Sequence, residues 1–162
     1  QGFIMKRFLL GLISLASMSS FASGSVECFN QAKETKDSYG TNIKTNQAIK
    51  LCSGSESFSP IECFNEAKGK TKDSYGTYIN TNQAIKLCSG SESLSPIECF
   101  NEAKKIKDFS GSYLNTNQAI YLCSGSESLS PIECLNDAKK TKDFSGSYLN
   151  TNQAIELCAQ RL

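Results

Sequence analysis

Hydrophobic residues return in the same order four times along the chain, at a spacing that predicts pairs of α-helices. In the third copy, Cys99, Ala103 and Ile106 lie at positions i, i+4 and i+7, with Ile97 and Phe100 beside them. Residues at this spacing share one face of a helix, so each copy is expected to contain a first helix with one buried face.

A Ser-Pro-Ile-Glu sequence marks the start of this first helix in three copies, at Ser59–Glu62, Ser95–Glu98 and Ser130–Glu133. Serine followed three residues later by glutamate is a capping box, and proline is favoured at the first helical position. We expect the helix to run for about 14 residues, for example from Pro131 to Ser145. The glycines expected to end it are Gly40, Gly76, Gly111 and Gly146.

A second, shorter helix is predicted in each copy after a short aromatic linker. Asn150 and Gln153 lie three residues apart, like the two members of a capping box, and Ala154, Ile155 and Cys158 supply an apolar side. Gly54, Gly90 and Gly125 follow the second helix in the first three copies and favour its termination. An α/β alternative would place strands at residues 112–114 and their equivalents, but three residues next to glycine make poor strands.

Eight cysteines accompany the repeats, with the first cysteines of successive copies 35, 36 and 35 residues apart. They allow pairing within each copy or across the copy junctions. Junction pairing leaves Cys28 and Cys158 over, whereas pairing within the copies uses all eight cysteines. The predicted disulfides are Cys28–Cys52, Cys63–Cys88, Cys99–Cys123 and Cys134–Cys158. Each disulfide closes a loop of about 25 residues and stabilises the fold by about 3.5 kcal/mol in the chain-entropy model.

These features predict an all-α protein of tandem disulfide-bridged αα-hairpins, stacked as a short right-handed solenoid within one repeat domain. The expected repeats are residues 23–58, 59–94, 95–129 and 130–162. The period resembles that of tetratricopeptide repeats, which use 34 residues in a helix–turn–helix. Their Trp, Leu-Gly and Tyr signature is absent, so the likeness extends to architecture only and no functional residues carry over.

Residues 1–22 resemble a secretory signal peptide. Lys6 and Arg7 precede an apolar stretch, and Ser20-Phe21-Ala22 offers small residues for cleavage after Ala22. Residues 1–4 precede the first methionine and are expected to be a non-native leader. The apolar stretch is short for a membrane span, so we expect a secreted or periplasmic protein with no membrane association after cleavage. Without the leader, 15 basic and 16 acidic residues remain, which does not favour nucleic acid.

No catalytic pattern is evident in the sequence, so we expect neither an enzyme nor a cofactor. The acidic pairs at i and i+4, such as Glu98 and Glu102, are explained by capping and by the helix dipole. The chain has no histidine to activate a hydroxyl nucleophile, and its cysteines are expected to be paired. A zinc site is not expected either, because there is no histidine and no Cys-x-x-Cys motif.

Two rows of residues are candidates for binding. Within the second-helix pattern Ala-Ile-x-Leu-Cys, the variable position is occupied by Lys50, Lys86, Tyr121 and Glu156 and is expected to face solvent. A row of such residues along a solenoid is where a partner would bind, although drift at an unconstrained surface position is the preferred explanation of the variation. The second row consists of the linker tyrosines Tyr78, Tyr113 and Tyr148. We expect these rings mainly to cover the open end of each hairpin core.

The sequence therefore predicts a non-catalytic monomer that binds another protein through its stacked faces. One alternative is a structural extracellular or envelope component without a specific ligand, and a more remote one is a small secreted hydrolase or toxin. Asn42 and Lys44 replace the tyrosine and asparagine of later copies, so the first copy is expected to be a capping repeat with a polar outer side.

Overall fold

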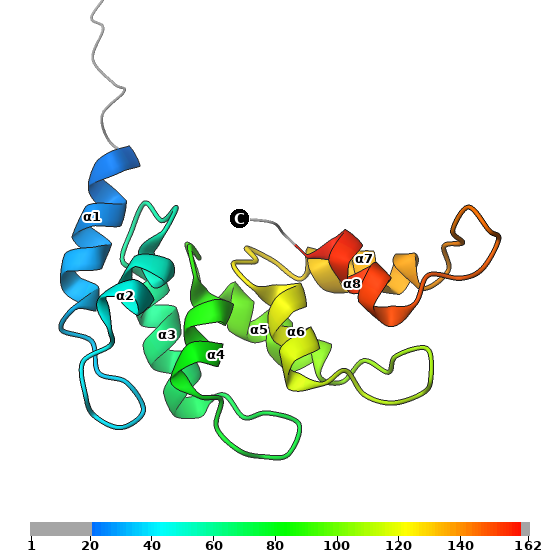
Figure 1. Ribbon diagram of the computed structural model, residues 1–162, viewed down its shortest axis with the longest axis horizontal. Coiled ribbons are helices and arrows are strands. Elements are labelled where there is room, and N and C mark those ends of the chain that lie inside the picture. The colour runs from blue at the N-terminus through cyan, green and yellow to red at the C-terminus, as the bar shows by residue number, and fades with distance from the viewer. Residues whose placement is uncertain (1–20, 160–162) are drawn as a thin grey trace, which may run out of the picture.

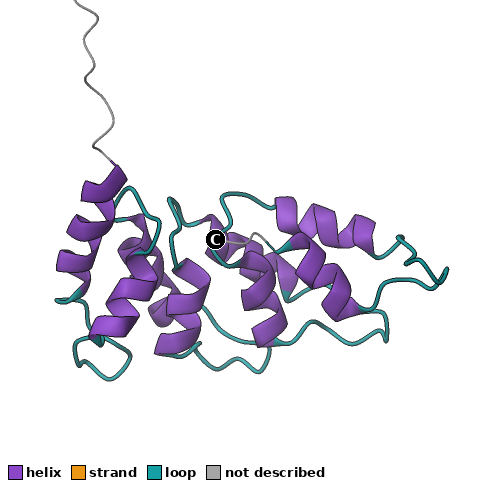
Figure 2. Ribbon diagram, turned by 45° about the horizontal axis from the view of Figure 1, so that its top comes forward, coloured by secondary structure: helices purple, strands orange, loops and turns teal. Residues whose placement is uncertain are grey.

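The computed structural model describes residues 21–159, which form eight α-helices joined by loops (Figures 1 and 2). The helices are α1 (Phe21–Ala32), α2 (Thr45–Cys52), α3 (Ser59–Lys70), α4 (Thr81–Cys88), α5 (Ser95–Ala103), α6 (Thr116–Cys123), α7 (Ser130–Ala138) and α8 (Thr151–Cys158). Among residues 21–159 there is no strand, only isolated β-bridges in the loops. The predicted all-α class is therefore confirmed.

Parts of the predicted sequence features lie outside the described residues. These parts are residues 1–20 of the expected leader and residues 160–162 of the fourth repeat. The expected cleavage position after Ala22 lies in the first turn of α1.

One disulfide joins the two helices of each unit, and the predicted pairing of all four is confirmed. The bonds are Cys28–Cys52, Cys63–Cys88, Cys99–Cys123 and Cys134–Cys158. The two Cα atoms of each pair are 5.5–5.6 Å apart, within the usual range for a disulfide, and no cysteine is free. Bonds of this kind persist in oxidising compartments, which indicates an extracellular or periplasmic environment.

The helix pairs follow one another in a row, with the first unit at the left of Figure 1 and the fourth at the right. Helices of one unit contact those of the same unit and of its immediate neighbours. The second helices, α2, α4, α6 and α8, pack more closely on one another than α1, α3, α5 and α7 do. The row is therefore packed more tightly along the second helices than along the first helices.

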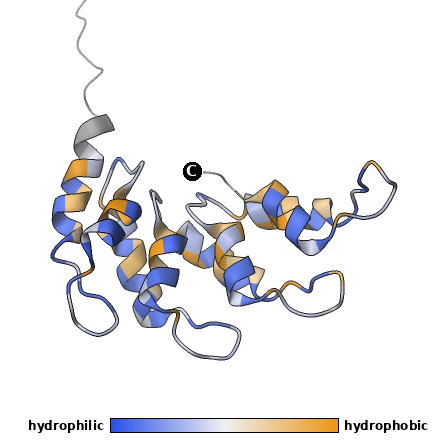
Figure 3. Ribbon diagram, viewed as in Figure 1, coloured by the Kyte–Doolittle hydropathy of each residue, from blue (hydrophilic) through white to orange (hydrophobic). Residues whose placement is uncertain are grey.

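A continuous apolar core runs along this row. Phe64, Phe100, Leu87 and Leu122 are fully buried, and the disulfides of the middle units lie among them. Each helix in Figure 3 carries hydrophobic segments between hydrophilic ones, as expected of helices with one buried face. Each unit thus completes its core against the units beside it, as in other repeat arrays.

The start of the second helices agrees with the predicted capping box in three units. The side-chain oxygen of Asn80 accepts a hydrogen bond from the backbone N–H of Gln83 at 3.0 Å, and the Gln83 side chain accepts one from the Asn80 N–H. The same two bonds form at α6 and α8. In the first unit Lys44 has no acceptor to offer, so only its N–H donates to the side chain of Gln47.

The first helices end earlier than predicted. The expected helix from Pro131 to Ser145 is wrong, because α7 ends at Ala138 and a loop follows. The Asp143 carboxylate accepts hydrogen bonds from the backbone N–H groups of Ser145 and Ser147. Such side-chain bonds stabilise a turn in competition with the helix. Gly146, with a φ of +84°, lies in that turn and does not end the helix.

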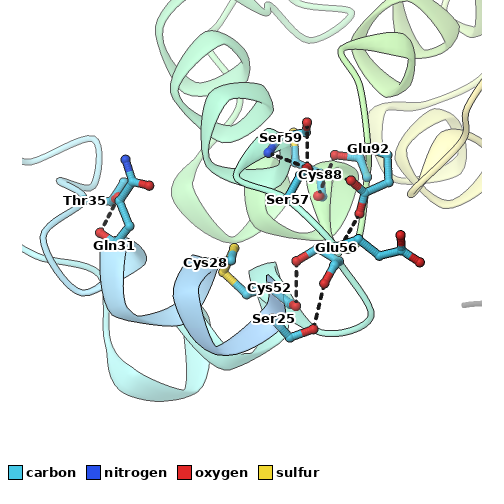
Figure 4. The surroundings of a disulfide bond; sticks show 12 residues. Ser25, Cys28, Gln31, Thr35, Cys52, Glu56, Ser57, Ser59, Cys88 and Glu92 are labelled. Atoms are coloured by element: carbon cyan, nitrogen blue, oxygen red, sulfur yellow. Dashed lines mark hydrogen bonds between the residues drawn. A yellow bond between two sulfur atoms is a disulfide. The ribbon is translucent and has the colours of Figure 1, made fainter. Parts of the chain in front are cut away.

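The first helices also begin differently from the prediction. The residue before α3 is Phe58, and Ser59 lies inside the helix, without the expected capping-box bond to Glu62. The Ser59 N–H donates instead to the hydroxyl oxygen of Ser57 at 3.1 Å (Figure 4). The hydroxyl of Ser57 in turn donates to Glu92, in the loop after α4, so the cap of α3 is bonded to a residue distant in the sequence.

Candidate binding surfaces

An amide ladder runs along the starts of the second helices. In each step Nε2 of a glutamine donates a hydrogen bond to Oδ1 of an asparagine one unit later. The steps are Gln47 to Asn82 at 2.8 Å, Gln83 to Asn117 at 3.5 Å and Gln118 to Asn152 at 3.0 Å. Each glutamine also belongs to the start of its own helix, so the ladder joins the capping of one helix to the next unit.

A second set of bonds between units uses lysine and glutamate side chains. Nζ of Lys68, Lys104 and Lys139 donates to the backbone carbonyl of Lys36, Lys72 and Lys107, respectively. Burial lowers the pKa of Lys68 and Lys104 below that of an exposed lysine, while a nearby aspartate opposes the shift. The carboxylate of Glu92 accepts from the N–H of Glu56 at 2.6 Å, and Glu127 repeats this bond at Glu92 (Figure 4).

Shallow grooves on the second helices contain the first row of predicted binding residues. One groove is lined by Lys50, Lys86 and residues of the amide ladder, and the next by Tyr121, Glu156 and the following ladder residues. Three of the four side chains are exposed and Lys86 is half-buried, so the prediction that this row faces solvent is confirmed.

Neighbouring members of this row come into direct contact. Nζ of Lys86 lies 5.1 Å from the ring centroid of Tyr121, although the two residues belong to different units. A cation at this distance is attracted to the face of the ring. Equivalent positions of successive second helices therefore lie side by side, and the row forms one continuous surface.

The linker tyrosines form a separate surface along the loops. Tyr78, Tyr113 and Tyr148 are 54%, 60% and 61% exposed. The expectation that these rings cover the hairpin core is wrong, because the following residue, Ile79 or Leu114, is the buried one. Alternation of side chains at the β-bridge explains the difference, since successive residues of an extended segment point to opposite sides. Each exposed ring instead lies beneath a lysine at 5.1–5.5 Å.

Aspartates in the loops accept hydrogen bonds that stabilise the turns before these tyrosines. Asp108 accepts hydrogen bonds from the hydroxyl of Ser110 at 2.7 Å and from the N–H groups of Ser110 and Ser112. These bonds stabilise the charged carboxylate and hold the pKa of Asp108 below its usual value. The pKa values of Asp37 and Asp143 are lowered in the same way, first of all by the hydroxyls of Thr41 and Ser145.

The first unit does not have the polar outer side that the sequence predicts. Asn42 lies in the loop and Lys44 at the start of α2, whereas Val26 and Ile49 are 58% and 57% exposed. The first unit therefore presents apolar residues at the end of the row.

Within residues 21–159, no group of histidine, cysteine, aspartate or glutamate side chains is arranged to hold a metal ion. Over the same residues, none of the helices has the length and apolar character needed to span a bilayer. Comparison with protein-family models, with curated proteins and with solved structures gave no match.

Sequence reasoning found the variable row on the second helices but missed the bonds between units. The repeated glutamine predicts only a helix cap together with the asparagine three residues before it, whereas the ladder acceptor is the asparagine directly before the equivalent glutamine of the next unit. A glutamine that caps its own helix keeps its Nε2 group as a donor, and this is the signal that could have revealed the ladder.

Proposed function

We propose that this chain is a non-catalytic, exported repeat protein that binds an extended segment of another protein along its second helices. In this proposal the four units form a short right-handed solenoid, and the row of Lys50, Lys86, Tyr121 and Glu156 lies along its second helices. The observation that carries the proposal is the groove of the second helices, where constant amides surround four varied and solvent-facing residues.

The constant amides favour a peptide as the ligand. A primary amide has two N–H donors and an acceptor oxygen with two lone pairs, so each ladder bond uses only part of its capacity. An extended peptide offers alternating N–H and C=O groups at regular intervals, which such a row can pair with. Asn82 and Asn117 are exposed and line the groove, so they are placed for this pairing.

The varied residues favour a partner whose charge changes along its length. Lys50 and Lys86 lie in the first half of the row, Tyr121 follows, and Glu156 lies in the last unit. Complementary charges at an interface select the partner and its register. We therefore expect a segment with acidic residues beside the first two units, an apolar or aromatic residue near Tyr121, and a basic residue near Glu156.

Site-specific photo-crosslinking tests this proposal. A photoreactive phenylalanine at position 121 is compared with the same residue at position 39, an exposed loop tyrosine outside the groove. In the native extracellular milieu, position 121 should capture one protein, and mass spectrometry should map the cross-link to a segment with the expected charge order.

The affinity of that purified partner should fall at least tenfold with Lys50→Glu and Lys86→Glu combined, and should be unchanged with Tyr39→Ala. Unchanged affinity after Tyr113→Ala and Tyr121→Ala would refute both candidate rows.

A structural role without a specific ligand is the second candidate. The amide and lysine bonds recur at all three junctions and the glutamate bond at two, and together with four disulfides they stiffen the row independently of the variable row residues. If cells that lack the protein show a defect that the wild-type chain and the groove variants rescue equally well, the structural role is supported.

A further inference from the structure

Two apolar residues of the first unit, Val26 and Ile49, are exposed, whereas their equivalents in the second and third units are buried. Ile49 is 57% exposed, whereas its equivalents Ile85, Ile120 and Ile155 are 1–3% exposed. Val26 is 58% exposed, whereas Ile61 is 4% exposed. Val26, Phe29 and Ile49 line one pocket at this end of the row. We call this surface the head face.

The fourth unit shows the complementary pattern at the other end of the row. Leu157 is 64% exposed, whereas its equivalents Leu51, Leu87 and Leu122 are completely buried by the unit that follows them. Leu149 is half-buried, whereas Leu114 in the third unit is completely buried. We call the surface of Leu149 and Leu157 the tail face.

We propose that a second copy of this chain places its head face on the tail face of the first copy and thereby reproduces the junction between units. The argument rests on continuity with an existing interface, which the chain forms three times internally. The head and tail faces differ, so the contact is heterologous, and an assembly that does not close into a ring keeps one head and one tail exposed. Open chains of increasing length are the expected product.

The polar bonds of the junction are also available in this arrangement. Gln153 is equivalent to Gln118 and would donate to Asn46 of the second copy, which is equivalent to Asn152. Lys33 of the second copy is equivalent to Lys68 and would donate to the carbonyl of Lys142. The amide ladder would then continue from one copy into the next.

Charge complementarity at the new junction further supports a second copy. Equivalent positions of neighbouring second helices lie side by side, as the contact between Lys86 and Tyr121 shows. Stacking of two copies brings Glu156 of one copy beside Lys50 of the other. This pair has opposite charges, whereas the equivalent internal pair of Lys50 and Lys86 has like charges. The contact between copies is therefore favoured by charge at this position. The proposal takes the place of the monomer expected from the sequence.

Sedimentation of the disulfide-bonded chain and two single variants tests the proposal. The wild-type mass should rise with concentration beyond that of a dimer. Ile49→Lys blocks the head and Leu157→Lys blocks the tail, so each variant alone should stay monomeric at every concentration. An equimolar mixture should form dimers and nothing larger, because only the tail of the first variant and the head of the second remain competent. Tyr39→Lys, at an exposed loop position, is the matched control and should associate like the wild type.

The charge contact has its own test. Glu156→Lys should weaken the association, and Glu156→Lys combined with Lys50→Glu should restore it, since the exchanged pair is again attractive. Ile49 and Leu157 are both exposed, so their lysine variants should leave the circular dichroism spectrum unchanged. If either lysine variant loses helicity, a serine variant at the same site replaces it. A wild-type chain that is monomeric at millimolar concentration overturns the proposal. So do dimers that Ile49→Lys abolishes and Leu157→Lys leaves intact, because they would join head to head.

Discussion

Helices α2 and α4 have the identical sequence TNQAIKLC but differ in their surroundings. Both contain eight residues and both end at the cysteine that bonds to the first helix of the same unit. Ile49 in α2 is nevertheless 57% exposed, whereas Ile85 in α4 is 2% exposed. The comparison shows that local sequence determines the helix, while the neighbouring unit determines which of its residues belong to the core.

The largest expected difference between the two helices concerns these isoleucines. Ile85→Ala should lower the free energy of unfolding by about 3 kcal/mol, because it removes buried methyl groups and leaves a cavity. Ile49→Ala should change it by less than about 0.5 kcal/mol, as is usual for exposed positions. Urea unfolding with intact disulfides, at a concentration where the chain is monomeric, measures both values. Equal effects would mean that the two helices have the same surroundings, against the burial described above.

A smaller difference is expected at the helix starts. Asn80→Ala removes the side-chain acceptor of the α4 capping box and should cost about 1 kcal/mol. Lys44→Asn should give α2 the acceptor that it lacks and raise stability by about 0.5–1 kcal/mol. Thermal unfolding of both variants gives the comparison, with Asn115→Ala in α6 as the internal reference for the loss of a cap. A Lys44→Asn variant no more stable than the wild type would contradict a local role for the cap.

The smallest expected difference is between the loops, because their turns are local. The pKa values of Asp37 in the first unit and of Asp143 in the last are both held low by hydroxyl and backbone donors. A carboxyl group whose pKa is lower in the folded chain contributes stability above its unfolded pKa of about 3.9, and this stability is lost as the pH falls through the folded value. Titration by NMR should give values below 3.8 for both residues, and Ser145→Ala should raise the value of Asp143. A normal pKa for Asp37 alone would show that the turn depends on its unit.

Some elements could be predicted from the sequence because their causes are local or topological. Asn80 and Gln83 bond to each other within one turn, so the capping box of α4 is local. The disulfides followed from the repeat and from the antiparallel helix pair, which brings Cys63 and Cys88 to the same end of the hairpin. The variable row was found by comparing the copies, because its exposure follows from the helical period.

Other elements could not be predicted, because their partners are distant in the sequence. Ser57, which accepts the N–H of Ser59 at the start of α3, also bonds to Glu92, 35 residues away. The side chain of Gln47 was explained by its own helix, and its bond to Asn82 in the next unit gave no local signal. The first helices were predicted too long because helical periodicity continues into the loop, where the hydrogen bonds of Asp143 favour a turn.

By itself, the sequence determined the eight helices, the starts of three second helices and the four disulfides, since these depend on short-range hydrogen bonds and on the order of the cysteines. Only the tertiary structure decided which apolar residues are buried and which remain at the ends. Ile85 is buried because a unit precedes its own, and Ile49 is exposed because no unit precedes its own within the described residues. An identical run of eight residues cannot specify this difference, because the hydrophobic effect depends on the area that a neighbour removes from water.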